Sequence, residues 1–163
     1  MSTGDPFDVF ARLGATSPLA PGQNVEAGRA AFRKITKMVE EPAPPIAETR
    51  DIEVPGGDGP RPARLYIPND APETGPLILF LHGGGYAFCD LDTHDSVCRR
   101  IAALAQVRVV SLDYRLAPEH LFPAAYEDSE AAFDWIAGEG ARELGADTPR
   151  WRRPAATGSR FNT

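Results

Sequence analysis

The sequence has few of the features that mark secreted or metal-binding proteins. Only two of its 163 residues are cysteines, Cys89 and Cys98, and they form no C-x-x-C pair. We therefore expect two reduced thiols in a cytoplasmic protein, and neither a zinc site nor another metal site. The first residues, MSTGDPFDVFARLG, contain no basic region followed by an apolar run. We therefore do not expect them to form a signal peptide.

Long apolar runs and basic clusters are also scarce. No segment approaches the roughly 18 consecutive apolar residues of a membrane-spanning helix, so no membrane span is expected. The formal net charge is −6 and the pI about 5.1, which argues against nucleic acid or an anionic membrane as a partner. Hydrophobic residues make up 42% and charged residues 25% of the chain, as in an ordinary globular domain with a core.

The glycine-rich stretch FLHGGGYAF matches no nucleotide-binding motif. Three glycines, Gly83 to Gly85, follow His82, but no G-K-[ST] follows them. Phe88 stands where a G-x-G-x-x-G motif beginning at Gly83 needs its third glycine. Three interpretations remain open from the glycines alone: a flexible loop, a phosphate-binding turn, or backbone N–H groups that approach a developing oxyanion.

The hydrophobic pattern in the first half of the chain predicts one helix and a hairpin. Asn24 is a candidate N-cap for a helix over residues 25–41 with one buried apolar face, and the prolines at 42–45 end it. Residues 47–56 and 58–68 alternate as antiparallel strands, with glycines in the turn between them.

The second half predicts two buried strands, each followed by a helix. The apolar runs 77–81 and 107–114 are typical of strands buried on both faces. Residues 93–105 read as a helix capped by Thr93, and residues 123–144 as a second helix that Gly138 and Gly140 interrupt. The expected apolar faces of these two helices comprise Val97, Ile101, Leu104 and Ala105 in the first, and Tyr126, Ala132, Phe133, Ile136 and Leu144 in the second.

A strand, a helix and a strand over residues 77–112 form a βαβ unit. The sequence therefore predicts an α/β protein whose core is a parallel sheet covered by helices, with no internal repeat and no second domain. Ligands bind beyond the carboxyl ends of the strands in such sheets. His82 to Gly85 lie at such an end.

Two long stretches carry a specific family resemblance. HGGGYAFCDLDTHDSVCRRIA and VVSLDYRLAPEHLFPAAYEDSEAAFDWI resemble the hormone-sensitive-lipase-like (family IV) esterases of the α/β-hydrolase fold. The resemblance covers about residues 47–147. It implies an incomplete α/β-hydrolase sheet, made of the first hairpin and two buried parallel strands, with flanking helices. Residues 1–45 would then be a cap-like helical arm and 46–147 the N-terminal half of the hydrolase domain.

The resemblance implies roles for the glycine stretch. The N–H groups of Gly84 and Gly85 would stabilise the oxyanion of an acyl-transfer reaction, as in the H-G-G-G loop of lipases and esterases. Gly83 would allow the tight turn. His82 would orient the loop by hydrogen bonds and would not act as the catalytic base. Tyr86 would either line the acyl site or simply pack.

A second set of residues is expected to support the loops. Asp113, Arg115 and Glu119, in the stretch DYRLAPEH, would hold them together by charge-assisted hydrogen bonds. His94 and His120 match scaffold positions and are not expected to be catalytic. The resemblance implies a small-molecule carboxylic ester as substrate, an acyl-serine intermediate and no cofactor.

The catalytic nucleophile of such an esterase is missing from the sequence. The family carries its serine in G-x-S-x-G, followed by an acid and a histidine. None of the six serines here has glycine both two residues before and two residues after it. We expect residues 148–163 to form an aberrant, disordered tail. When suitable codons are assumed, this stretch read in a shifted frame encodes V-A-A-T-G-G-D. We therefore expect a chain that is truncated or frameshifted after about residue 147.

Three functional hypotheses follow from these residues. The chain is the inactive N-terminal part of an ester hydrolase, or a non-catalytic pseudoenzyme or carboxylate-binding module, or a fragment complemented by a second chain that carries the missing half. In each case residues 77–81 lack a neighbouring strand and form an exposed apolar edge. Marginal stability and aggregation are expected.

Overall fold

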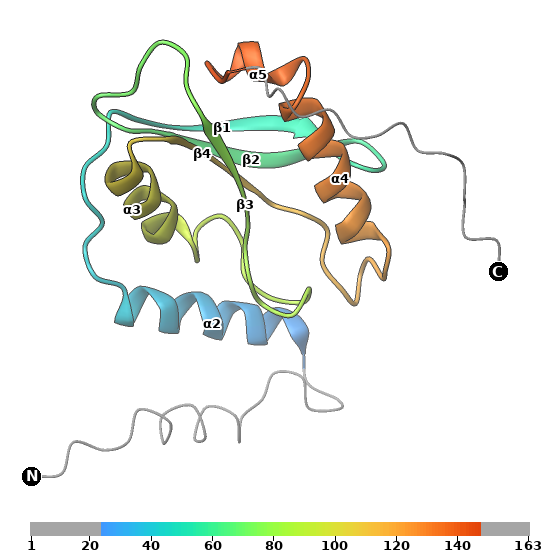
Figure 1. Ribbon diagram of the computed structural model, residues 1–163. Coiled ribbons are helices and arrows are strands. Elements are labelled where there is room, and N and C mark those ends of the chain that lie inside the picture. The colour runs from blue at the N-terminus through green and yellow to red at the C-terminus, as the bar shows by residue number, and fades with distance from the viewer. Residues whose placement is uncertain (1–23, 148–163) are drawn as a thin grey trace, which may run out of the picture.

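The computed structural model describes residues 24–147 (Figure 1). The part of the expected arm before residue 24 and the aberrant tail at 148–163 lie outside the described residues. The helices and strands follow one another in the order α2 (Val25–Val39), β1 (Glu48–Pro55), β2 (Pro60–Ile67), β3 (Leu77–Leu81), α3 (Asp95–Ala105), β4 (Arg108–Leu112), α4 (Ala124–Ile136) and α5 (Gly140–Glu143).

The four strands form one mixed sheet in the order β1-β2-β4-β3. β1 and β2 pair antiparallel with Pro55 opposite Pro60, which confirms the predicted hairpin. β3 and β4, which precede and follow α3 in the sequence, pair with each other in parallel, and this confirms the predicted βαβ unit. β2 pairs antiparallel with β4. The expectation of a parallel sheet therefore holds only for β3 and β4.

Two apolar cores lie on the two faces of the sheet. On one face, Val110 and Leu112 of β4 belong to a cluster with Ala132 and Ile136 of α4. On the other, Val109 packs with residues of α3. Successive side chains of a strand point to opposite faces, so β4 serves both cores and is buried along its whole length.

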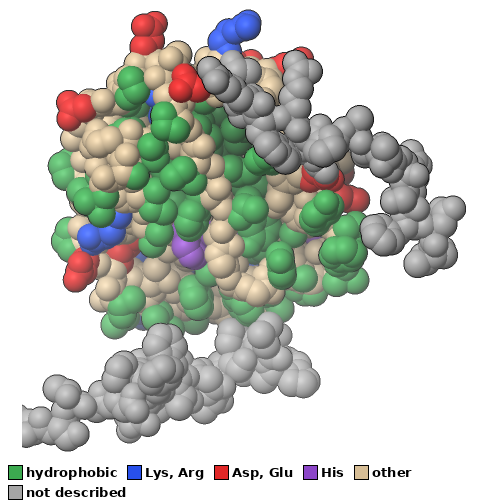
Figure 2. Space-filling view, in the orientation of Figure 1, with side chains coloured by type: hydrophobic (Ala, Val, Ile, Leu, Met, Phe, Trp, Pro, Cys, Tyr) green, Lys and Arg blue, Asp and Glu red, His purple; other side chains and the backbone are tan. Residues whose placement is uncertain are grey.

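β3 departs from its prediction because it is not buried on both faces. It is the last strand of the sheet, and its side chains Ile78 and Leu81 are 37% and 45% exposed. The reason is that α3 packs mainly against β4 and β2, and α4 mainly against β1. Figure 2 shows hydrophobic side chains gathered on the face that β3 crosses. The expected exposed apolar edge at 77–81 is confirmed for the part of the chain that the structure describes.

Helix α2 begins as predicted but does not bury its apolar face. The Asn24 side chain accepts hydrogen bonds from the N–H groups of Glu26 and Ala27, so Asn24 is the N-cap. No residue of α2 is buried, and Phe32 is 41% exposed. The helix lies apart from the sheet in Figure 1 and is held by long charged side chains rather than by apolar packing.

The predicted cap of α3 is wrong, and of its predicted apolar face only Ile101 packs against the core. Thr93 does not cap the helix, because its hydroxyl is bonded to the backbone of Asp90 instead. Val97 and Leu104, expected to be buried, are 43% and 83% exposed. The helix packs over β4 and β2 in an orientation that buries a different set of side chains, those of Ser96, Cys98 and Ala102.

Helix α4 shows a similar shift of its buried face. Ala132 and Ile136 are buried as predicted, whereas Tyr126 and Phe133 are 58% and 41% exposed. The buried face includes a charged residue, Asp128. The predicted interruption by glycines is confirmed, since α4 ends at Ile136 and α5 begins at Gly140.

Candidate functional site

The segment after β3 lines a pocket at the carboxyl end of the strand. The pocket has a volume of about 450 Å³. It is lined by the end of β3 and the glycine stretch on one side, and by β4's continuation and α4 on the other. These lining residues are Leu81, His82, Gly83, Gly84, Gly85, Tyr86, Tyr114, Ala125, Tyr126 and Ser129.

The backbone of this segment requires glycine at specific positions. Gly84 and Gly85 have φ angles of +120° and +61°, in the left-handed region. A Cβ atom on Gly84 would lie 2.3 Å from the carbonyl oxygen of Phe88, whereas a Cβ on Gly83 would meet nothing within 4 Å. The carbonyl of Gly84 accepts hydrogen bonds from the N–H groups of Ala87 and Phe88. The conformational demand therefore falls on Gly84 and Gly85 rather than on Gly83.

The two left-handed glycines leave backbone donors unused. Within residues 24–147, the N–H groups of Gly84 and Gly85 donate to no other protein group. Both residues line the pocket. Unpaired N–H groups beside a pocket can donate to a negatively charged oxygen without displacing a protein acceptor. The site therefore suits an anion or a developing oxyanion.

His82 holds the start of the glycine segment. Its Nδ1 donates to the carbonyl of Gly83 at 2.8 Å, and its ring stacks on Tyr114 with centroids 4.3 Å apart. The Tyr114 hydroxyl donates to the His82 carbonyl at 2.6 Å. Both the ring and the carbonyl of His82 are thus attached, which restrains the end of β3.

Burial favours the neutral form of this histidine. His82 is 3% exposed, and burial lowers its pKa below the ordinary value despite the bond to Gly83. Among the described residues its Nε2 has no hydrogen-bond partner, and it lies 3.9 Å from the Asp113 carboxylate. Burial raises the pKa of Asp113. Burial and the nearby His82 lower the pKa of His94.

Arg29 of α2 ties three segments together at the rim of the site. Its Nε donates to the carbonyl of Ala87 at 2.9 Å, and Nη2 donates to that of Ala117 at 3.0 Å. Its two terminal nitrogens also bind Glu119 at 2.9 and 2.8 Å. Ala117 in turn donates its N–H to the carbonyl of Tyr86 at 2.8 Å. The sequence pointed to Glu119 but not to its partner, because no local pattern links residues 90 positions apart.

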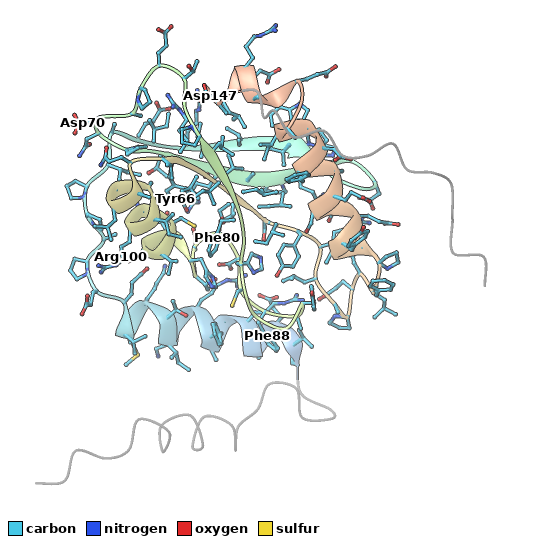
Figure 3. All side chains as sticks on the ribbon, in the orientation of Figure 1. Tyr66, Asp70, Phe80, Phe88, Arg100 and Asp147 are labelled. Carbon is cyan, nitrogen blue, oxygen red and sulfur yellow. The ribbon has the colours of Figure 1, made fainter. Side chains whose placement is uncertain are left out.

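α2 makes two further contacts with the same segment. Arg33 is bonded to Asp90, and the ring of Phe32 lies 6.5 Å from that of Phe88. In Figure 3 Phe88 lies beside α2. The helix is therefore attached to the body mainly through the residues that follow the glycine stretch.

Arg115 and Asp128 form a buried network behind the pocket. The guanidinium of Arg115 donates to both carboxylate oxygens of Asp128 at 2.9 Å, and to Asp58 at 2.6 Å. Asp128 also accepts the N–H groups of Arg115 and Gly57. Burial opposes ionisation of Asp128, but these bonds outweigh it and hold its pKa below the ordinary value. An acid at helical spacing from Ala132 and Ile136 is the signal that could have identified Asp128.

Two tyrosines and one serine complete the lining. Tyr86 and Tyr126 are 68% and 58% exposed, so they stand at the open side of the pocket. Ser129 lines the pocket, but its hydroxyl donates to the carbonyl of Ala125, one turn earlier in α4, at 2.7 Å. The hydroxyl hydrogen of Ser129 is therefore donated within α4 and not into the pocket.

Other kinds of site find no support in the part of the chain that the structure describes. Residues 24–147 contain no group of three or more potential metal ligands of the His, Cys, Asp or Glu type. None of their helices is both long and apolar enough to span a bilayer. Cys89 and Cys98 are buried free thiols.

Comparisons with known proteins relate this chain to esterases. Residues 78–151 match a family described as having the α/β hydrolase fold. The carboxylic ester hydrolase LipN and the esterase LipI, both of Mycobacterium tuberculosis, are 43% and 42% identical over 83% and 81% of this chain, which covers 35% and 41% of theirs.

Comparison with solved structures also finds similarity to an esterase. A hyperthermophilic esterase from the archaeon Pyrobaculum calidifontis superposes with a TM-score of 0.75 at 42% identity. The alignment covers 88% of this chain and 46% of that one. The chain thus spans less than half the length of these relatives.

Proposed function

We propose that this chain, which has part of the α/β-hydrolase fold of its esterase relatives, supplies the oxyanion-hole part of a carboxylic ester hydrolase. In this proposal the N–H groups of Gly84 and Gly85 donate to the oxygen that becomes negative when a nucleophile attacks the ester carbonyl. One observation carries the proposal: two left-handed glycines, with N–H groups that find no acceptor within residues 24–147, line a pocket of about 450 Å³.

The neighbouring residues would hold these donors in place. A fixed donor stabilises charge better than a mobile one, because no reorganisation is needed when the charge develops. His82 would restrain the segment from the side of β3, through its bonds to Gly83 and Tyr114. Tyr86, at the open side, would line the acyl part of the pocket.

The charged residues would act at a greater distance. Glu119 would support the site through Arg29, which reaches the carbonyl of Ala87. Arg115 would do so through Asp128, and Asp113 through its position beside His82. None of these side chains would contact the substrate.

We propose that the chain alone does not turn over esters. An acyl-enzyme mechanism needs an activated nucleophile, and no serine in the sequence lies in G-x-S-x-G. Ser129, which lines the pocket, donates to its own helix. Hydrolysis of a small-molecule ester would then require a serine, an acid and a histidine from outside residues 1–163.

The alternative function is a non-catalytic module that binds a carboxylate or another small molecule. The same free N–H groups favour it, since they can receive a carboxylate oxygen without any chemistry.

An NMR titration with butyrate tests whether Gly84 and Gly85 are the donors. Their amide resonances should shift on addition of butyrate, and a Gly84→Ala variant should lose the response. Gly83→Ala is the matched control, because a Cβ at that position meets nothing within 4 Å. Shifts confined to other residues would refute the assignment of the donors.

An assay with p-nitrophenyl butyrate separates the two functions. The chain alone should give no hydrolysis. The chain co-expressed with the remaining length of a related esterase should hydrolyse the ester, and Gly84→Ala should abolish that activity. Butyrate binding without hydrolysis in the complemented pair would favour the binding module. Activity that survives Gly84→Ala would place the reaction elsewhere.

Two further features belong to the proposal. The free, buried cysteines support a cytoplasmic location. Residues 1–45 would form a cap-like arm on the half-domain 46–147, and the attachment of α2 beside the glycine segment supports this division.

A further inference from the structure

We infer that one water molecule binds between Nε2 of His82 and the carboxylate of Asp113, and that it lets His82 keep the tautomer that holds the glycine stretch. This site does not use the N–H groups of Gly84 and Gly85, so the inference is independent of the proposed function. It rests on the bond made by the other ring nitrogen of His82, on the burial of Nε2, and on the position of Asp113.

His82 and Asp113 lie side by side because of the register of the parallel strands. Leu81 of β3 pairs with Leu112 of β4, so His82 and Asp113 are the next residues along the two strands. Nε2 of His82 lies 3.9 Å from Oδ1 of Asp113. A direct hydrogen bond needs about 2.7–3.2 Å. The two side chains are therefore adjacent but not bonded to each other.

The bond made by Nδ1 sets the chemistry of Nε2. Nδ1 of His82 lies 2.8 Å from the carbonyl oxygen of Gly83, which can only accept a hydrogen bond, so Nδ1 carries the proton. In a neutral imidazole the other ring nitrogen is then an acceptor. Burial favours this neutral form, since it lowers the pKa of His82. Nε2 consequently needs a donor.

No protein group within residues 24–147 supplies that donor. The side chain of His82 is fully buried, and its Nε2 has no hydrogen-bond partner in this part of the chain. Buried polar atoms in native proteins are nearly always paired with protein or with ordered water. An ionised Asp113 carboxylate is itself only an acceptor. Two acceptors therefore face each other, and a third group has to donate to both.

A water molecule can donate to both acceptors at once. One of its O–H groups points to Nε2 of His82 and the other to Oδ1 of Asp113, and the histidine stays neutral. Two hydrogen bonds of about 2.8 Å at a tetrahedral angle span about 4.4 Å. The observed separation of the acceptors, 3.9 Å, is close to this span. The Asp113 side chain is 35% exposed, so water reaches the site from that side.

The charges around the pair keep Asp113 an acceptor. Burial and the nearby Asp90 raise the pKa of Asp113, while Arg33 and Arg61 oppose the rise. The ordinary value is about 3.9, so the carboxylate is ionised at pH 8. It then has no proton of its own to give to Nε2 of His82, and the water remains the donor.

The water reconciles the ionised carboxylate with the tautomer of His82. Without it, a proton on Nε2 would be attracted to Asp113, and the lone pair left on Nδ1 would repel the carbonyl of Gly83. With it, Nε2 is satisfied as an acceptor and Nδ1 continues to donate to Gly83. The water therefore protects the bond that restrains the start of the glycine stretch.

Nitrogen NMR of the imidazole at pH 8 tests the inference in the wild-type chain. Two-bond correlations should place the proton of His82 on Nδ1. A rotating-frame Overhauser peak should connect a ring proton of His82 with a long-lived water. These two measurements decide the matter without any variant.

Substitutions of Asp113 test the second ligand of the water. In Asp113→Leu the water peak should disappear, and the Nε2 resonance should move to the position of an acceptor without a bond. In Asp113→Asn the side-chain amide can donate directly to Nε2, so the water peak should be lost while Nε2 keeps the resonance of a bonded acceptor. Asp70→Leu, which removes an exposed carboxylate, is the matched control and should retain the water peak.

Three results would overturn the inference. A proton on Nε2 in the wild type would show a direct bond to Asp113. A proton on Nδ1 without a water peak would show that no long-lived water is bound. A water peak that persists in Asp113→Leu, with circular dichroism showing a folded chain, would show that Asp113 does not hold the water.

Discussion

The guanidinium of Arg29 and the carboxylate of Glu119 form a two-pronged ion pair, with nitrogen–oxygen distances of 2.9 and 2.8 Å. The pair joins α2 to the segment after β4, and the same guanidinium donates to the carbonyl of Ala87, within the glycine stretch. Its hydrogen bonds lower the pKa of Glu119 to about 2. One side chain therefore couples the helix to the candidate site.

Replacing Arg29 by Gln should release α2 and loosen the glycine segment. The planar fork binds two carbonyls and a carboxylate at once, and a glutamine amide cannot replace that set. Amides of residues 85–89 should exchange faster with solvent, as measured by hydrogen exchange. Lys34→Gln, on the same helix and exposed, should leave their exchange unchanged. Equal effects of the two substitutions would show that α2 is held by charge in general rather than by Arg29.

Gly84→Ala should be far more damaging than Gly83→Ala. The added Cβ at 84 meets the carbonyl of Phe88 at 2.3 Å and occupies a left-handed conformation, whereas the Cβ at 83 has open space. Strain of this kind costs about 1–3 kcal/mol. Gly84→Ala should therefore lower the melting temperature measurably. Equal melting temperatures of the two variants would show that position 84 accommodates a Cβ atom without strain.

Asp128→Asn should destabilise the fold by about 3 kcal/mol, because it leaves the Arg115 charge without its buried counter-ion. The pKa of Asp128 is lowered in the fold, so its stabilising effect is present above its ordinary value of about 3.9 and is lost as the pH falls below it.

The difference in unfolding free energy between wild type and Asp128→Asn should thus shrink below about pH 4. Urea titrations across this range measure it. Glu143→Gln, an exposed acid, serves as the control. A difference that stays constant down to the acid transition would show that Asp128 contributes through its shape rather than its charge.

His82 and His94 should make the fold less stable in mild acid. Burial lowers both pKa values, so below about pH 6.5 the unfolded chain takes up protons before the folded one. The unfolding free energy should be at its full value above that pH and fall as the pH falls towards the folded pKa values. His82→Asn, which does not titrate, should reduce the slope. Retention of the full slope in the double variant at 82 and 94 would assign it to other groups.

The positions of the elements followed from local chemistry. Asn24 could be recognised as a cap because its side chain satisfies the N–H groups of the next residues, which needs no tertiary contact. The hairpin and the strands at 77–81 and 108–112 could be predicted from short-range patterns. What could not be predicted was which side of each helix faces inward. Leu104 is apolar but 83% exposed, since the docking of α3 on β4 and β2 selects another stripe.

The glycine stretch shows the same division. Its sequence alone indicated a loop at the carboxyl end of a strand, and it limited the chemistry to what backbone N–H groups and a histidine can do. The long pairs Arg29–Glu119 and Arg115–Asp128 could not be derived, since each joins residues that only folding brings together. The edge position of β3 likewise depends on the order of the strands in the sheet. Composition and periodicity reflect only interactions between residues that are close together in the chain. Which glycine is left-handed, which acid is buried and which edge stays open were settled by packing between distant segments.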